Sequence, residues 1–268
     1  MVKKVVVGLV GPPLAGKETV GNIGMDWAKQ NSFTSKRHRY RDVLEETLNL
    51  LNEARENGYC LEDPGCAETL RQILEKWSID ETNLNLRKLI KTLGDAYGYD
   101  AKKIEIGRES LQVMAQIMVK EESFGENALA HATGERLVKS FETIVWGDGV
   151  RWLADERYLR NLPNARHPDT RALILYVNAS ETVRFKRLRM RLRENEGGIT
   201  FEKFQEQGRA KNEIYIPDIG GRADKEITNN HEPGSLTEEQ TREFLRRDVI
   251  NFCNEMILPL LEKGINNV

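Results

Sequence analysis

Short, nearly continuous apolar runs alternate along this chain with longer segments in which apolar residues recur every three or four positions. Four of the runs are typical of strands, and they cover residues 2–10, 142–147, 171–177 and 225–229. Because such runs are apolar on both faces, they predict a parallel sheet with helices on either side. A fifth strand over residues 36–40 is only weakly marked. The pattern therefore indicates the α/β class.

Helical spacing dominates between the weakly marked strand and residue 141. Residues 41–54 show it clearly, since Val43, Leu44, Leu48 and Leu51 fall on one helical face. Further helices are predicted over residues 66–77, 82–97, 109–120 and 126–141. This stretch is too long for a simple crossover between neighbouring strands. We expect a single domain over residues 1–268 that carries a helical insertion at about residues 41–141.

The composition and the net charge limit the partners and the cellular location that we expect for this protein. A net charge of −2 over 268 residues provides no overall field for nucleic acid or an anionic membrane, so neither is an expected partner. No apolar run approaches the roughly 20 residues of a membrane span. A strand that begins by residue 5 leaves no room for a signal peptide. Cys60, Cys66 and Cys253 lack metal-site spacing and are expected to be free thiols, which favours a reducing, cytoplasmic location.

A glycine-bounded loop follows the first strand and precedes a predicted helix over residues 20–30. Its residues are Gly11, Pro12, Pro13, Leu14, Ala15, Gly16, Lys17, Glu18 and Thr19. Strand, loop, lysine and helix form the context of a phosphate-binding loop, in which backbone N–H groups and the helix N-terminus face a polyphosphate. Lys17 would reach the β- and γ-phosphates as a point charge. The alternative is a glycine-rich strand-to-helix turn that binds no ligand.

One position of this loop departs from the usual pattern. Ser or Thr normally follows the lysine and holds Mg²⁺, but here Glu18 follows and Thr19 comes one residue later. We expect Thr19 to be the metal ligand. An acidic residue between Lys and Thr resembles the loop of deoxynucleoside monophosphate kinases, which belong to the P-loop superfamily.

A second basic feature lies after the third strong strand. A helix predicted over residues 182–193 holds six cations, and Gly197, Gly198, a helix over residues 200–211 and a flexible stretch at residues 217–222 follow. Arg184, Arg187 and Arg191 share one helical face, whereas Arg189 and Arg193 lie off it. This arrangement predicts a lid over about residues 184–222 that clamps phosphate with arginine. The alternative is a solvated helix face.

The order of these elements is similar to that of nucleoside and deoxynucleoside monophosphate kinases and their dephospho-coenzyme-A-kinase-like relatives. The segment from Asp148 to Glu156 resembles their D-x-R-x-x-x-E motif, with Gly149 as one additional residue. The resemblance implies that Asp148 lies near the Mg²⁺ shell and that Arg151 reaches the acceptor phosphate. Residues 107–112 look like their R-E-x-L-Q segment, which implies a substrate-side role for Arg108 and Gln112. Residues 223–230 look like their A-D-x-x-I-x-N segment.

Simpler roles remain open for several of these residues. Asp148 could cap the following helix, and Arg151 could form a surface pair with Glu156. Arg108 and Gln112 could be solvated residues one helical turn apart. Arg41 could serve the dipole or the cap of its own helix rather than the substrate.

Taken together, the residues predict a three-layer P-loop fold that transfers the γ-phosphoryl group of ATP, with Mg²⁺, to a (deoxy)nucleoside monophosphate. Lys17 would hold the donor, Thr19 and Asp148 the metal, and Arg151 with Arg41 or Arg108 the acceptor phosphate. Arg187 and Arg191 would close over the transferring group. The alternatives are a kinase of another small acceptor, such as a dephospho-coenzyme-A-like molecule, and a nucleotide-binding switch or slow ATPase. A homodimer is left open.

Overall fold

The computed structural model describes residues 2–56, 68–69, 71–72, 75, 86–98, 103–119, 127–191, 199–209, 213–231 and 238–262. The chain divides into two compact units, of which one comprises Met1–His38 with Ser140–Val268 and the other Arg39–Lys139. The first unit contains the predicted strands and the glycine-bounded loop. In the part of the chain given above, no helix has both the length and the apolar character needed to cross a membrane.

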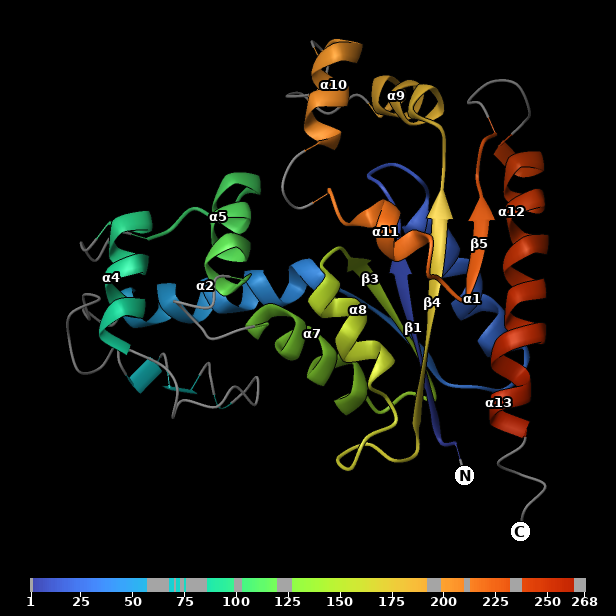
Figure 1. Cartoon of the computed structure of the whole chain (residues 1–268), viewed down its shortest axis with the longest axis horizontal. Helices are drawn as coiled ribbons and strands as arrows, with labels where there is room; N and C mark the ends of the chain where they lie inside the picture. Colours follow the sequence, from blue (N-terminus) through green and yellow to red (C-terminus); the bar gives the residue numbers. More distant parts are fainter. Residues whose placement is uncertain are drawn as a thin grey trace. The chain divides into compact units, whose positions relative to one another are not determined.

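Within the described residues, five strands form one sheet in the order β2-β3-β1-β4-β5. Figure 1 labels β3, β1, β4 and β5 side by side in that order. Their bounds are β1 (Lys4–Val10), β2 (Ser35–Arg39), β3 (Ile144–Val150), β4 (Thr170–Asn178) and β5 (Lys225–Thr228). Strand β1 pairs in parallel with β3 and β4, and β4 pairs in parallel with β5. The strand order reverses direction at β1, and the carboxyl end of a strand at such a point is where α/β sheets bind ligands.

Two adjacent residues of β1 show how the sheet is covered. A Cβ atom on Gly8 would lie 2.5 Å from Leu159 Cδ1 of α8 (Leu153–Arg160), so this position faces that helix closely. The next residue, Leu9, points to the other face, where its Cδ1 lies beside Gly21 of α1 (Lys17–Gln30). Helices α8 and α1 therefore cover opposite faces of the sheet, which gives the unit three layers.

The remaining helices of this unit complete the two outer layers. Helix α11 (Ile216–Gly220) packs on β1 and β4, and Gly220 lies against the ring of Tyr176. Helix α12 (Glu238–Phe252) packs along α1 and β5, and continues through the π-helix η2 (Cys253–Ile257) into α13 (Leu258–Glu262). Helices α9 (Glu181–Met190) and α10 (Phe201–Gly208) pack on each other after β4.

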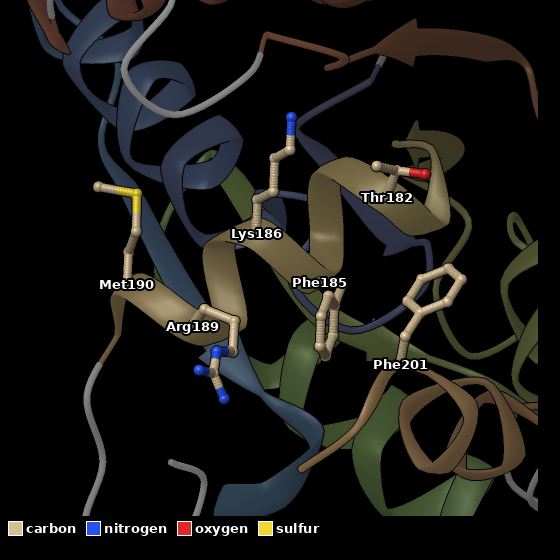
Figure 2. Close-up of a pocket in the computed structure, with 6 residues that line it drawn as sticks. All are labelled: Thr182, Phe185, Lys186, Arg189, Met190 and Phe201. Carbon is tan, nitrogen blue, oxygen red and sulfur yellow. The ribbon is translucent and has the colours of Figure 1, made fainter. Parts of the chain in front are cut away.

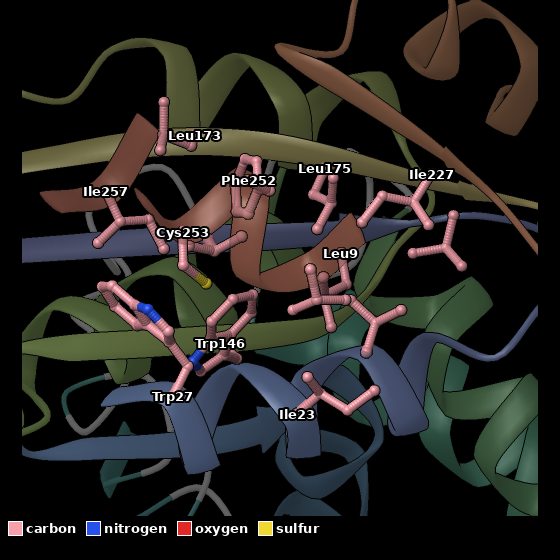
Figure 3. Close-up of a cluster of buried hydrophobic side chains, with 14 of the residues drawn as sticks. Leu9, Ile23, Trp27, Trp146, Leu173, Leu175, Ile227, Phe252, Cys253 and Ile257 are labelled. Atoms are coloured by element: carbon pink, nitrogen blue, oxygen red, sulfur yellow. The ribbon is translucent and has the colours of Figure 1, made fainter. Parts of the chain in front are cut away.

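The main core lies between β1, β3 and β4 on one side and α1 and α12 on the other (Figure 3). Trp146 is fully buried at its centre, and its ring centroid lies 6.5 Å from that of Phe252. Gly24 of α1 makes room for it, because a Cβ atom there would lie 2.1 Å from Trp146 Cζ2. The free thiol of Cys253 is buried in the same core, and burial raises its pKa to about 12. This thiol is therefore a packing group rather than a reactive one.

The second unit consists of helices in its described residues. They are α2 (Tyr40–Glu56), α4 (Leu86–Tyr97), α5 (Arg108–Val119) and α7 (Ala128–Lys139). Helices α2, α5 and α7 pack on one another, and α4 packs on α5. The buried Asn52 amide exchanges two hydrogen bonds with the backbone of Ile104, at 3.0 and 2.7 Å. Arg136 of α7 pairs with Glu46 of α2 at 2.6 Å. These polar contacts fix the helices where the apolar faces alone would allow sliding.

The α/β class and the parallel sheet are confirmed, and the weakly marked strand at residues 36–40 is β2. The expectation that residues 217–222 form a flexible stretch is wrong, because most of this segment belongs to helix α11. Pro217 suits the first turn of a helix, and Ile216 and Ile219 are buried. The helix predicted over residues 66–77 lies mostly outside the described residues.

Candidate active site

The loop at residues 11–16 has a backbone that depends on its two glycines. Gly11 has a φ of 152°, and a Cβ atom there would lie 2.2 Å from the main-chain oxygen of Val177. Gly16 has a φ of 102°, and a Cβ atom there would lie 2.4 Å from Asn229 Nδ2. Any side chain would therefore displace β4 or the end of β5 from the loop. The N-terminus of α1 begins immediately afterwards at Lys17, which is the arrangement that favours anions.

Lys17 is folded back over this loop. Its Nζ donates to the main-chain oxygen of Gly11 at 2.6 Å and to that of Pro12 at 3.0 Å. Burial lowers the pKa of Lys17 to about 8, and the Asp148 carboxylate partly opposes the shift. The hydrogen bonds that hold the ammonium within the described residues are thus to neutral carbonyl groups, and the charge of a bound phosphate would stabilise it further.

The loop is fastened to the carboxyl end of β5 by Asn229 and Arg187. Asn229 Nδ2 donates to the main-chain oxygen of Ala15 at 2.8 Å. Arg187 Nη1 donates to the main-chain oxygens of Leu14 and Ala15 at 3.0 and 3.3 Å. Its Nη2 donates to the main-chain and side-chain oxygens of Asn229 at 2.9 and 3.0 Å and to the main-chain oxygen of His231 at 3.2 Å. Arg187 therefore supplies positive charge next to the loop while it holds the loop in place.

Asp148 lies near the carboxyl end of β3 and does not cap the following helix. Its Oδ2 accepts from Arg37 Nη1 at 3.3 Å, and Arg37 Nη2 donates to Glu18 Oε1 at 2.7 Å. Arg37 comes from β2, the neighbour of β3. The Glu18 carboxylate therefore pairs with Arg37. This contact does not favour Glu18 as the Mg²⁺ ligand in place of the usual Ser or Thr.

Arg151 lies in a turn that the Asp155 carboxylate stabilises by accepting backbone hydrogen bonds. Asp155 Oδ2 accepts from the backbone N–H groups of Arg151 and Trp152, both at 3.0 Å. Asp155 is buried, which raises its pKa to about 6, and within the described structure its Oδ1 has no hydrogen-bond partner. The side chain of Arg151 pairs with Glu213 at 2.9 Å. Glu156 instead pairs with Arg222, so Arg151 and Glu156 do not form the surface pair considered above.

The additional residue Gly149 has a structural explanation. In the β1–β3 pairing Leu9 is opposite Asp148 and Val10 is opposite Val150, so Gly149 is the extra residue of a bulge. A bulge re-aims the side chains around it. Here it lies between Asp148 and Arg151, so it sets the orientation of both relative to the loop.

Asp148 and Arg151 lie beside the loop because of the strand register. In the β1–β3 pairing Asp148 is opposite Leu9, and Val150, the residue before Arg151, is opposite Val10, the residue before the loop. Glu213 is brought there by its ion pair with Arg151. The charges of Asp148 and Glu213 raise the pKa of Lys17, whereas those of Arg151 and Arg184 lower it. The structure therefore brings together three of the predicted site residues, Lys17, Asp148 and Arg151, and adds Glu213 to them.

The other arginines of the 182–193 segment do not converge on one point. Arg184 is buried, donates to the main-chain oxygen of Ala179 at 3.1 Å and lies over the ring of Phe204. Arg191 is exposed at the end of α9, and Arg193 lies outside the described residues. A role in phosphate binding stays a prediction for Arg187 and Arg191.

The side of α9 that faces away from Arg187 bears a groove of about 540 Å³. Figure 2 shows its lining residues, which are Thr182, Phe185, Lys186, Arg189, Met190 and Phe201. None of them belongs to the loop or contacts it in the hydrogen bonds given above. We assign no function to this groove.

Three predicted substrate-binding residues belong to the second unit. Arg41 is exposed in the first turn of α2 and pairs with Glu45, one turn further on. Arg108 is the first residue of α5, and the exposed Gln112 lies one turn after it. A role of these residues in binding the acceptor stays a prediction.

The donor atoms near the loop fit Mg²⁺. Thr19 offers a hydroxyl in the first turn of α1 and Asp148 a carboxylate, and both are hard oxygen donors. Mg²⁺ in such sites keeps several waters and is completed by substrate phosphates. Among the residues that the structure describes, no cluster of three or more His, Cys, Asp or Glu side chains could hold a metal ion by itself.

Sequence reasoning missed Arg37, Glu213 and Asn229. Arg37 lies in the weakly marked strand, and Glu213 lies in the predicted lid region without a motif of its own. Asn229 did carry a signal, since it is the asparagine of the A-D-x-x-I-x-N segment.

No protein-family model and no curated protein matches this sequence. Among solved structures, the chain is similar to shikimate kinase from Acinetobacter baumannii, with 12% identity, a TM-score of 0.42 and 94% coverage of each chain. It is also similar to a gluconokinase from Sinorhizobium meliloti 1021, with 12% identity, a TM-score of 0.34 and coverage of 96% of this chain and 99% of the other. At these values the fold assignment rests on the sheet topology and the loop of this chain.

Proposed function

We propose that this protein transfers the γ-phosphoryl group of ATP to the phosphate of a (deoxy)nucleoside monophosphate. The observation that carries the proposal is the grouping of Lys17, Asp148 and Arg151 at the glycine-bounded loop, which the β1–β3 register and the contacts of Lys17 with the loop produce. Each of the three serves a different part of a phosphoryl transfer between two polyanions.

The donor would lie in the loop. Backbone N–H groups of residues 11–16 and the N-terminus of α1 would face its phosphates, and Lys17 would exchange its carbonyl partners for phosphate oxygens. Thr19 and Asp148 would hold Mg²⁺, which neutralises charge on the phosphates when it is bound. Arg187 would keep the loop in its binding conformation through Leu14 and Ala15.

The acceptor phosphate would bind at Arg151. In the structure Nη1 of this guanidinium pairs with Oε1 of Glu213 at 2.9 Å, and an oxygen of the acceptor phosphate would take the place of that carboxylate oxygen. A phosphate acceptor is ionised at neutral pH, so the reaction requires no general base. Catalysis would then rest on positioning and on neutralising charge.

An acceptor panel in a coupled ADP-release assay tests this proposal. We expect ADP release that depends on a nucleoside monophosphate and requires Mg²⁺. Release that depends instead on a hydroxyl acceptor, such as a dephospho-coenzyme-A-like molecule, would contradict the acceptor proposed here, and Asp148 would then be the candidate general base. Slow release that no acceptor accelerates would contradict the kinase assignment and favour a nucleotide-binding switch.

A further inference from the structure

The salt bridges of Arg37 give the acidic residue that follows Lys17 a role. Arg37 extends from β2 and divides its guanidinium between two carboxylates, since Nη2 contacts Glu18 and Nη1 contacts Asp148. The distance to Glu18 is 2.7 Å and that to Asp148 is 3.3 Å. Arg37 is therefore bound more closely by Glu18, although Glu18 is the more exposed of the two acids.

The route of the Arg37 side chain is built into α1. A Cβ atom on Gly21 would lie 2.9 Å from Arg37 Cδ, so the absence of a side chain at Gly21 leaves room for the arginine stem. Glu18 and Gly21 are three residues apart and lie on the same face of the helix. The Arg37 side chain is only 15% exposed. The packing of its stem against Gly21 therefore fixes the position of the Arg37 side chain, in addition to its attraction to the two carboxylates.

The two acids compete for one cation. A guanidinium that pairs fully with Asp148 would cancel the carboxylate charge that a metal ion requires. Glu18 draws the guanidinium towards itself and so leaves Asp148 only partly neutralised. The contact with Arg37 uses Oδ2 of Asp148, and the other carboxylate oxygen takes no part in it.

We propose that Glu18 sets the cation affinity of Asp148 by competing with it for Arg37. This inference rests on the function proposed above, in which Asp148 binds Mg²⁺ together with the nucleotide. Arg37 and Glu18 are positioning residues in this scheme, because they act on the metal only through Asp148. The scheme also gives a physical reason for an acid at the position where the loop usually has Ser or Thr.

Binding of Mn²⁺ to the protein–ADP complex, measured by electron paramagnetic resonance, tests the competition without any turnover. Glu18→Gln should weaken Mn²⁺ binding by about fivefold, which is the upper range for a solvent-exposed ion pair. Arg37→Met should bind Mn²⁺ at least as tightly as the wild type. The double variant should bind like Arg37→Met, since Glu18 has no effect once the arginine for which the two acids compete has been removed.

The double variant decides between two explanations. If Glu18 acted directly on the metal by its own charge, Glu18→Gln would weaken binding equally with and without Arg37, and the competition would be overturned. Arg37→Gln repeats the test with a different side chain in case the methionine disturbs packing at Gly21. Arg39→Met is the matched control on the same strand, since Arg39 pairs with Asp42, and it should bind Mn²⁺ like the wild type.

The wild-type protein separates this inference from the function on which it rests. If wild-type protein and ADP together bind Mn²⁺ no more tightly than ADP alone, both proposals fail. If the wild type binds Mn²⁺ but the double variant stays as weak as Glu18→Gln, only the competition for Arg37 is overturned.

Discussion

The guanidinium of Arg151 and the carboxylate of Glu213 form an ion pair of 2.9 Å, and the Glu213 side chain is 8% exposed. In the proposed reaction the acceptor phosphate must replace this carboxylate. Glu213 therefore competes with the acceptor for the same guanidinium.

Glu213→Gln should strengthen binding of the acceptor. We expect the KM for the nucleoside monophosphate to fall by at least about fivefold, because leaving the buried Glu213 carboxylate without its partner costs more than the roughly 1 kcal/mol of an exposed ion pair. Steady-state kinetics at saturating ATP measures the effect. Glu206→Gln, an exposed change on α10, is the control and should leave the KM unchanged. An increase in KM for Glu213→Gln would mean that the carboxylate assists the acceptor.

Lys17→Ala should abolish turnover while the fold is retained. In the described structure Lys17 Nζ donates its hydrogen bonds to loop carbonyls, so we expect its loss to remove donor binding and to leave the sheet and its core intact. We expect the rate to fall by at least about a hundredfold, as for the loss of one preorganised donor to a transition-state charge. Turnover and thermal unfolding are measured on the same preparation. Near wild-type transfer by a folded variant would contradict the kinase assignment.

Nucleotide affinity should depend on pH through Lys17. Its pKa is about 8 in the free protein, and a bound polyphosphate would raise it. Below pH 8 the lysine is already protonated, so the affinity for ADP should be constant. Above pH 8 binding must take up a proton, and the affinity should fall by up to about tenfold per pH unit. Calorimetric titrations from pH 7 to about 9.5, in buffers of different ionisation enthalpy, detect both the fall and the proton uptake. A flat profile without proton uptake would be inconsistent with this role.

Thr19 rather than Glu18 should supply the side-chain oxygen to Mg²⁺. Thr19→Val should raise the Mg²⁺ concentration for half-maximal rate by about tenfold or more, the usual cost of weakening a metal site. Glu18→Gln should raise it less, because Glu18 acts through Arg37. A Mg²⁺ titration of the rate compares the two variants. The reverse ranking would show that the loop register is wrong.

Arg187→Ala should impair both the loop and the reaction. The change removes every hydrogen bond that Arg187 makes to Leu14, Ala15, Asn229 and His231. We expect kcat to fall by at least about a hundredfold and the melting temperature to drop, since buried oxygens lose their donors. Arg209→Ala, at the exposed end of α10, should stay within a few-fold of the wild type. Loss of stability with unchanged kcat would reduce Arg187 to a structural residue.

The sequence predicts best what depends on neighbouring residues. The strand, the glycines, Lys17 and the following helix lie within one short stretch, so the loop could be identified locally. Arg37 and Glu213 could not be, because their partners Asp148 and Arg151 lie far away in the chain and become neighbours only in the folded sheet. Helix α11 was missed because a short segment with proline and two glycines has little helical pattern. The bulge at Gly149 requires the register of two strands, which no single segment contains.

The fastening of the loop by Asn229 has a consequence for the newly made protein. The loop is synthesised before the groups that hold it, since Asn229 and the carbonyl of His231 are added more than two hundred residues later. A nascent chain that ends before β5 therefore has the whole loop sequence but not the groups that hold its shape. Competence to bind nucleotide should therefore arise only after β5 has been synthesised, so ATP could not act as a template for the folding of its own site before that point.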